Sequence, residues 1–348
     1  MPRRRVTSSM VATRAGVSRT TVSFVLNARA GSGIPDETRR RVLRAARDLG
    51  YVPSAAATTL ASGRTQTIGF VVCDARHLLT DAFLPQAIFM LTQVAHARGF
   101  RVLVEAVDDP TAPRAYETLV RATRIDGMVV INPRRDDMQL AALIESRYPV
   151  VTIGHPPGGT GYAFDVDNVA ATRTITDHLL AAGRRCLAYL GYGAPSYTTV
   201  VERLEGYRQA LADAGLPFDE THVVYGDYSA ESGEAATATL LARLGYAAGA
   251  TPPFDGLVCG NDTVALGALT ALRSLGLRVP DDVAVVGFDD IPIAAHAAPP
   301  LTTMRSPLLR LGEGSARLVI DLIEGGTGRP PPARLQAELI VRTSCGSD

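Results

Sequence analysis

Three polar side chains follow directly after apolar runs, which is where parallel α/β proteins usually gather their ligand-binding groups. His155 ends the stretch IGH, Asn261 lies in GND, and Asp289 lies in GFDD. The carboxyl ends of parallel strands meet at one edge of a sheet, so an imidazole, an amide and a carboxylate placed there can converge on one ligand. These groups donate and accept hydrogen bonds, which indicates a binding site rather than an active site.

Residue types that commonly perform catalysis do not occur here in catalytic patterns. The chain has no GxSxG nucleophile elbow and no Walker A phosphate loop, and its six histidines do not follow metal-ligand spacing. The four cysteines are scattered without a CxxC pair, and we expect buried, reduced thiols at Cys73, Cys186 and Cys259. The sequence therefore predicts no enzyme activity, no catalytic residue, no metal and no cofactor.

Compact β-branched runs alternate with helical patterns from Thr67 onward, and these elements must position the polar side chains. We expect strands at 67–72, 101–107, 126–131 and 149–154, and helices near 84–98, 112–123 and 136–146. Strands that are apolar on both faces and alternate with helices predict a parallel sheet covered by helices on both sides.

The same pattern returns in the second half of the chain. A run at 185–191 repeats the first strand, and a helix at 202–214 follows it. DGLVCGND at 255–262 resembles DGMVVINP at 126–133, and the run at 282–290 resembles the fourth strand and its exit. The repetition predicts two similar doubly wound lobes with a ligand cleft between them.

The first 64 residues are basic, whereas the remainder of the chain is acidic. This segment holds twelve arginines against three carboxylates, a formal charge of +9, although the whole chain has no net charge. Codon bias can account for the absence of lysine, but it does not account for the clustering. Cationic side chains that neutralise phosphates supply most non-specific nucleic-acid affinity, so a nucleic acid is the expected partner.

The basic segment has the pattern of a small helical unit. Three short helices are expected at about 9–15, 18–26 and 35–51. Ala12, Gly16 and Val22 are a small residue, a turn glycine and a β-branched residue at the spacing that lets two helices cross closely. The expected core of this unit consists of Val11, Val17, Val22 and Leu26. The pattern favours a helix-turn-helix, and a plain amphipathic helix capped by Ser18 is the alternative.

Phe24 stands among outward polar positions of the second expected helix. An aromatic side chain in the major groove can pack on thymine methyl groups, which is one way to recognise a T·A base pair. Packing against the third helix is the other interpretation of Phe24.

Several separate motifs, in order along the chain, resemble the lac repressor (LacI/GalR) family of bacterial transcription regulators. The motifs are VTSSMVATRAGVSRTTVSFVLN, ERLEGY, GND, VPDDVAVVGFDD and PPLTTMRSP. The resemblance implies a helix-turn-helix headpiece and a periplasmic-binding-protein-like α/β core of two doubly wound parallel-sheet lobes. It further implies a homodimer that binds a near-palindromic double-stranded operator and a small effector that changes its DNA affinity.

The resemblance also implies roles for individual residues that contact DNA. The base-reading positions correspond to Arg19, Thr20 and Phe24. The phosphate contacts correspond to Ser18, Thr21, Ser23 and Asn27. A hinge helix corresponds to residues 54–62, where Leu60 would enter the minor groove beside Ala57.

The effector site implied by the resemblance lies between the two lobes. The corresponding residues are Asp74, His77, Phe83, His155, Phe164, Arg203, Tyr228, Asn261 and Asp289. Arginine, carboxylate and amide groups beside a flat aromatic ring suit a polyhydroxylated ring, so a sugar is the first expectation. The loop at 77–83 departs from the asparagine–proline–phenylalanine loop that is usual in the family.

Domain boundaries follow from these assignments. We expect a headpiece at 1–50, a hinge helix or linker at 51–66 and a core at 67–348. Lobe 1 would comprise about 67–165 and 305–330, and lobe 2 about 166–304 and 331–348.

Two other functions are compatible with parts of the sequence. GYGAPS at 191–196 partly resembles a dinucleotide-binding loop, which would indicate an oxidoreductase, but the third glycine is missing. A stand-alone sugar-binding protein would fit the core but not the basic N-terminal segment. MPRRRVTSSM lacks the apolar stretch of a secretory signal, and no apolar run is long enough to span a membrane. We therefore expect a protein of the bacterial cytoplasm that joins the nucleoid when bound to its operator.

Overall fold

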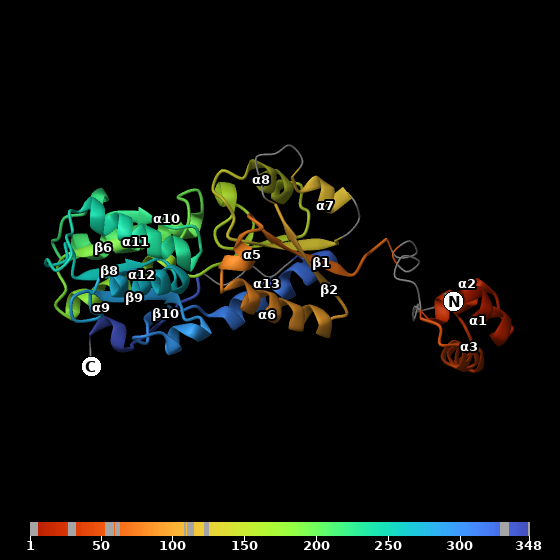
Figure 1. Ribbon diagram of the computed structural model, residues 1–348. Helices are drawn as coiled ribbons and strands as arrows, with labels where there is room; N and C mark the ends of the chain where they lie inside the picture. The colour runs from red at the N-terminus through yellow and green to blue at the C-terminus, as the bar shows by residue number, and fades with distance from the viewer. Residues whose placement is uncertain are drawn as a thin grey trace. The chain divides into compact units, whose positions relative to one another are not determined.

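The computed structural model consists of two compact units, Met1–Gln66 and Thr67–Asp348. It describes residues 6–26, 33–52, 59, 63–107, 109, 115–121, 125–327 and 334–346. Figure 1 shows the helices of the first unit in red and the two sheets of the second unit from orange to blue.

The described residues of the first unit contain three named helices. They are α1 (Ser8–Ala15), α2 (Arg19–Leu26) and α3 (Asp36–Leu49), so the three expected helices are confirmed. Val11, Val22 and Val42 are fully buried where the helices meet, and Val17 and Leu26 pack against them from partly exposed positions.

Local signals in the sequence explain how α1 ends and α2 begins. Gly16 adopts the left-handed backbone conformation (φ 65°), which places its amide on the carbonyls of Ala12 and Thr13 and closes α1. Ser18 Oγ then accepts a hydrogen bond from the amide of Thr21 (3.1 Å), so Ser18 caps α2 as its position suggested. Arg41 of α3 donates from Nε to the carbonyl of Ala15 (3.0 Å), which fixes α3 against the end of α1.

The second unit contains two mainly parallel sheets with matching strand order. The first has the order β2-β1-β3-β4-β5, and the second has the order β11-β10-β9-β8-β6-β7. The strands of the first sheet are β1 (Thr67–Val72), β2 (Arg101–Ala106), β3 (Gly127–Ile131), β4 (Val150–Ile153) and β5 (Tyr162–Phe164). Those of the second are β6 (Leu187–Gly191), β7 (Val223–Tyr225), β8 (Gly256–Cys259), β9 (Ala284–Asp289), β10 (Thr302–Arg305) and β11 (Glu338–Ile340), of which β11 is antiparallel.

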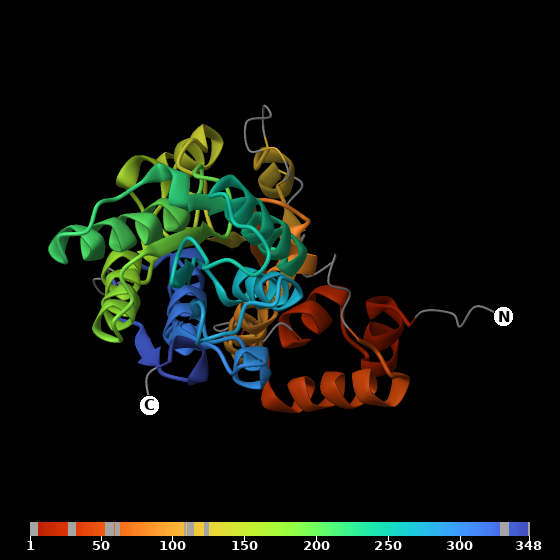
Figure 2. The same ribbon diagram turned by 60° about the vertical axis from the view of Figure 1, so that its left-hand side comes forward.

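Helices cover both faces of each sheet. They are α5 (His77–Thr80), α6 (Leu84–Ala97), α7 (Glu117–Arg121), α8 (Met138–Glu145), α9 (Asn168–Ala181), α10 (Thr198–Asp213), α11 (Ala230–Arg243), α12 (Asp262–Ser274) and α13 (Leu308–Ile323). Although α13 follows strands β6 to β10 of the second sheet in the chain, it packs beside α6 on the first sheet, as the ribbon views show (Figures 1 and 2). The chain therefore crosses between the lobes more than once.

Alternation along the strands explains why two layers of helices are needed. Leu187 and Tyr189 of β6 belong to one buried cluster with α9 and α10, whereas Ala188 and Leu190 belong to another with α11 and α12. Successive side chains of a strand point to opposite faces, so a run without polar residues must be covered on both sides.

The predicted fold class is confirmed, and the sequence repeats correspond to equivalent strands. β3 and β8 each stand third in the order that runs from β2 and from β7, and β4 and β9 each stand fourth. One expectation was wrong: Cys186 is exposed, because it precedes β6 instead of lying within it, while Cys73 and Cys259 are buried. The expected helix at 112–123 is seen as α7, and the residues on either side of α7 lie outside the described part.

The pair α11 and α12 packs backbone against backbone through a glycine. A Cβ atom at Gly267 would lie 1.9 Å from the carbonyl oxygen of Ala230 and 2.6 Å from the amide nitrogen of Glu234. No side chain fits between two backbones at that separation, so Gly267 sets the distance between these helices.

We expect Gly267→Ala to lower the free energy of unfolding of the second unit by about 1–3 kcal/mol because of overpacking. Helix propensity alone would predict the opposite, a gain of about 1 kcal/mol. Thr239→Ala, at an exposed position of α11, serves as the control and should be nearly neutral. Urea unfolding of the three proteins measures the difference, and a stabilised Gly267→Ala protein would contradict the close approach.

Candidate functional site

A cleft between the two lobes collects polar groups from the carboxyl ends of both sheets. It encloses about 420 Å³, including the open solvent at its mouth. The lining residues are Asp81, Phe83, Asn132, Ile153, Gly154, Asp165, Val166, Asn168, Tyr192, Thr199, Arg203, Asp289, Ser306 and Leu311. The position, at the carboxyl ends of both parallel sheets, is that of a small-molecule site in an α/β protein.

Arg203 of α10 organises the polar wall of this cleft. Its Nε donates to Asn168 Oδ1 (3.0 Å), and its two terminal nitrogens donate to the Gly260 carbonyl (2.5 Å) and to Asp289 Oδ1 (3.4 Å). The guanidinium also lies 3.6 Å from the ring centre of Phe288. Burial opposes the positive charge, yet Tyr192 and Asp289 raise the pKa of Arg203 above its usual value, so it remains a cation.

Two residues at strand ends hold unusual backbone conformations in the cleft. Asp289, the last residue of β9, has φ 104°, and Asn132, which follows β3, has φ 49°. Asp289 Oδ1 also accepts a hydrogen bond from Ser306 Oγ (2.9 Å). Strained backbone at a ligand cleft is typical of binding sites, where it aims a side chain at the ligand.

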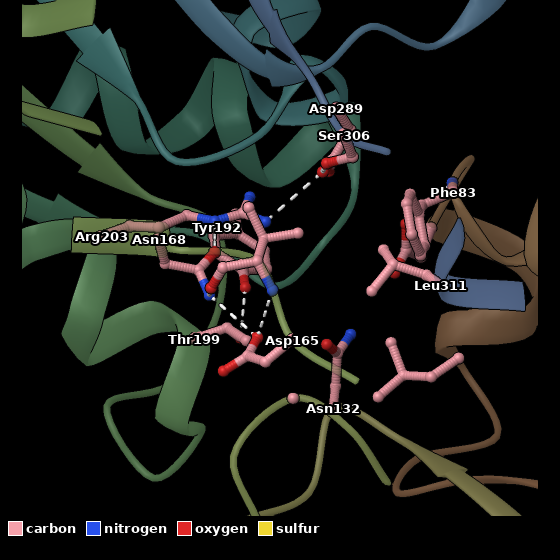
Figure 3. A pocket seen from close by; sticks show the side chains of 14 residues that line it. Phe83, Asn132, Asp165, Asn168, Tyr192, Thr199, Arg203, Asp289, Ser306 and Leu311 are labelled. Carbon is pink, nitrogen blue, oxygen red and sulfur yellow. Dashed lines mark hydrogen bonds and ion pairs between the residues drawn. The ribbon is translucent and has the colours of Figure 1, made fainter. Parts of the chain in front are cut away.

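The wall opposite Arg203 is apolar. Phe83 and Leu311, from the start of α6 and from α13, face Arg203 and Tyr192 across the open space (Figure 3). Ile153, at the end of β4, adds to this apolar side. The cleft is therefore amphipathic, with an apolar surface on one side and hydrogen-bonding groups on the other.

Two further carboxyl groups line the cleft. Burial, reinforced by the negative charge of Asp289, raises the pKa of Asp81 to about 7. Burial and the nearby Glu202 raise the pKa of Asp165 to about 7. Asp165 lies in the chain crossover between the lobes, where its Oδ1 accepts hydrogen bonds from the Val166 amide and from Asn168.

Of the nine residues implied as effector contacts, Phe83, Arg203 and Asp289 line this cleft together. Asn261 is buried as the cap of α12, where its Oδ1 accepts from the Val264 amide (2.9 Å). Phe164 is buried in the core against α13, because Gly314 leaves no side chain in its place.

Three others, Asp74, His77 and Tyr228, lie outside the lining of this cleft. His77 of α5 stacks on Tyr228 of the second lobe with ring centres 3.9 Å apart, and Tyr197 lies 5.7 Å from His77. Burial lowers the pKa of His77, which keeps the stacked ring neutral at pH 7. Asp74 pairs with Arg76 (2.6 Å). The ring contacts of His77 with Tyr228 and Tyr197 thus join the lobes through an aromatic cluster instead of lining the cleft.

The remaining residue of the nine, His155, is half-buried after β4. Its Nδ1 lies 3.1 Å from the carbonyl of Pro156, and its own carbonyl accepts from Thr198 Oγ1 (3.4 Å). Its backbone therefore takes part in the contact between the lobes.

Sequence reasoning missed most of the polar lining. Asn132 and Asp165 follow strands and Asn168 begins a helix, which is the signal that could have identified them, whereas Asp81 follows the short helix α5. Asp81 lies only two residues before Phe83, and its Oδ1 accepts a hydrogen bond from the Phe83 amide (3.0 Å).

The outer surface of α2 is a second candidate site. Ser18, Arg19 and Thr20 are exposed, whereas Thr21, Ser23 and Phe24 are half-buried, and Val22 and Val25 face the core. The expected contacts Asn27, Ala57 and Leu60 lie outside the described residues, as does the hinge segment 54–62 apart from Thr59.

Other classes of site find no support in the described part of the chain. It contains no cluster of three metal-ligating side chains. No helix within it has the length and apolar character needed to cross a membrane.

Two family models match the sequence. The model for bacterial regulatory proteins of the lacI family matches residues 10–54, and the model for a periplasmic binding protein-like domain matches residues 176–345.

Whole-length relatives support the same relationship. The transcriptional regulator CelR of Thermobifida fusca is 37% identical over 347 residues, which cover 98% of this chain and 99% of the relative. A solved complex of CelR with cellobiose matches with 36% identity and a TM-score of 0.72, covering 98% of this chain and all of that chain. The lac repressor dimer bound to operator and the anti-inducer ONPF matches with 28% identity and a TM-score of 0.83, covering 98% and 99%.

We expect Arg203→Met to destabilise the second unit by about 3–5 kcal/mol, because it leaves the carboxylate of Asp289 buried without its cation. Arg208→Met is the control on the same helix: that side chain is exposed and lies over the Phe218 ring, so its loss should cost about 1 kcal/mol or less. Thermal or urea unfolding distinguishes the two, and equal effects would show that the buried network contributes little.

Proposed function

The chain belongs to the lacI family of bacterial regulatory proteins, a family of DNA-binding transcriptional regulators and not of enzymes, and we propose that it represses transcription under the control of a sugar bound in the cleft. The observation that carries the sugar assignment is the amphipathic cleft. A sugar ring has an apolar face that packs on side chains such as Phe83 and a rim of hydroxyl groups that suits Asp289, Asn132 and the remaining donors of Arg203. The complex of the relative CelR with cellobiose makes a β-linked glucose disaccharide the first ligand to test.

The first unit would supply the DNA-binding surface. We assign base contacts to Arg19, Thr20 and Phe24 and phosphate contacts to Ser18, Thr21, Ser23 and Asn27. The exposure of Arg19 and Thr20 on α2 and the +9 charge of the first 64 residues support this assignment. In this proposal residues 1–50 are the headpiece, 51–66 with Ala57 and Leu60 form the hinge, and 67–348 form the two-lobed core.

A homodimer is the assembly that we propose for the protein in the bacterial cytoplasm. The lac repressor match is a dimer on its operator, and two-fold symmetry in a protein corresponds to a near-palindromic DNA site. In this chain α6 leaves Phe89 59% exposed and α13 leaves Leu309 61% exposed, which provides apolar surface on the first lobe for a second copy.

The proposed regulation is a shift between conformations of the two lobes. The cleft walls come from both sheets, so a ligand that contacts Phe83 on one side and Arg203 on the other favours one relative position of the lobes. A ligand changes an equilibrium only by the difference between its affinities for the two states. That difference would reach the hinge residues of the dimer and change operator affinity.

We expect a sugar of this class to change operator affinity by about 5–150-fold, a coupling of about 1–3 kcal/mol. Fluorescence anisotropy of labelled operator, with and without cellobiose, measures it. Phe83→Ala and Asp289→Asn should reduce the response while leaving sugar-free operator binding intact, and Asp281→Asn at an exposed position is the matched control. Equal operator affinity of the full chain and a chain without residues 1–64 would refute the DNA-binding assignment.

We expect Phe24→Ala to reduce discrimination at one operator base pair by roughly tenfold or less, because it removes an apolar contact with a thymine methyl group. Phe24→Leu, which keeps an apolar side chain, should retain part of that discrimination. Competition among single-base variants of an operator selected from random DNA provides the measurement. Uniform weakening on every sequence would instead assign Phe24 to packing within the headpiece.

A further inference from the structure

The lining of the cleft contains more acidic than basic side chains. Asp81, Asp165 and Asp289 line it together with Arg203, which is the one cationic side chain in the lining among the described residues. We infer that Asp81 and Asp165 determine the charge class of the effector: the cleft takes a hydrogen-bond-donating ligand without negative charge and excludes anions. This inference rests on the proposed function and deepens it.

Arg203 is already engaged by the protein. Each of its three nitrogens donates to a protein acceptor, and its Cζ lies over the rings of Phe288 and Tyr192, 3.6 and 4.8 Å from their centres. An arginine binds an anion most strongly by bidentate contact through a guanidinium fork that faces the ligand. Here both terminal nitrogens already donate to Gly260 and Asp289, so each keeps one N–H group for a ligand while the positive charge is shared with the carboxylate of Asp289.

Asp81 brings a carboxyl group to the cleft without a cation of its own. The side chain is buried, with 5% exposure, and its Oδ1 accepts the Phe83 amide. The charged and titratable groups that act on it are Asp289, which opposes its ionisation, Arg203, which favours it, and the phenols of Tyr192 and Tyr228. Both carboxyl groups, Asp81 and Asp289, thus depend on the same arginine.

Asp165 is in a similar position on the crossover side of the cleft. Its Oδ2 is buried and has no hydrogen-bond partner among the described residues. Glu202 opposes its ionisation, while Arg334 and Arg203 favour it. Arg334 is however held closely by Glu202, so it neutralises that carboxylate first.

A ligand that donates hydrogen bonds satisfies these oxygen atoms, and a ligand with a carboxylate or phosphate adds another negative charge beside them. Like charges brought together in a binding site cost several kcal/mol. Neutral sugars and amino sugars therefore fit the cleft, whereas sugar acids and sugar phosphates do not.

The first experiment needs no ligand. The raised pKa values of Asp81 and Asp165 mean that the folded protein binds more protons than the unfolded chain between about pH 4 and pH 7. The free energy of unfolding therefore falls as the pH rises through this range. Asp81→Asn and Asp165→Asn keep the acceptor oxygen but cannot ionise. We expect each to raise the Tm of the full chain relative to wild type at pH 8 and to have a smaller effect at pH 5, with Asp281→Asn unchanged at both.

The second experiment compares three β-1,4-linked disaccharides by titration calorimetry with the full chain at pH 7.5. They are cellobiose, its glucuronyl analogue cellobiouronate and the diamino disaccharide of glucosamine. We expect cellobiouronate to bind at least about tenfold more weakly than cellobiose, and the double variant Asp81→Asn/Asp165→Asn to narrow that difference.

The outcomes separate this inference from the proposed function. If cellobiouronate binds as tightly as cellobiose, the charge selection is wrong although a sugar effector stands. If the two Asn variants gain no thermal stability at pH 8, the carboxyl groups are already compensated and the inference fails whichever sugar binds. If they gain stability but no disaccharide binds, the uncompensated acidic cleft is supported and the carbohydrate assignment is overturned.

Discussion

A buried arginine is the constraint on which the architecture of the cleft depends. A guanidinium removed from water requires acceptors for its N–H groups, and Arg203 obtains them from Asn168, Gly260 and Asp289. These acceptors lie at the start of α9, directly after β8 and at the end of β9, so three distant segments must converge on one side chain. The strained backbone of Asp289 is consistent with this requirement, because φ 104° directs its carboxylate toward Arg203.

The duplicated sheets explain why polar groups from so many segments reach a single place. In each lobe the parallel strands end at the same edge, and because the central strands are mostly apolar, the polar side chains of the cleft lie at or beyond those ends. α13 packs on the first sheet after the chain has already built most of the second, which adds Leu311 to the apolar wall. Crossing between lobes thus produces a cleft whose two walls differ in polarity.

Much of the fold could be predicted from the sequence, because continuous apolar runs identify parallel strands without any knowledge of tertiary contacts. Arg203 and Asp289 were also accessible, since both lie in recognisable motifs. The places of Phe164 and Asn261 were not, because they depend on the missing side chain of Gly314 and on the start of α12. Asp165 could have been found from its position after β5, but Asp81 follows a short helix, and the burial that raises the pKa of both carboxyl groups depends on tertiary contacts that no local pattern reveals.

Separation of charge along the chain gives the two candidate sites opposite preferences. The first 64 residues carry a formal charge of +9 in a chain whose total is zero, so the remaining residues carry an equal negative charge. Phosphate-rich DNA is attracted to the former and repelled by the latter, because long-range interactions follow net charge. An acidic effector would share the preference of DNA for the basic unit and would be repelled by the core. An uncharged sugar or an amino sugar is not subject to this competition. The DNA preference of the first unit and the charge preference of the cleft therefore both follow from the same separation of charge along the chain.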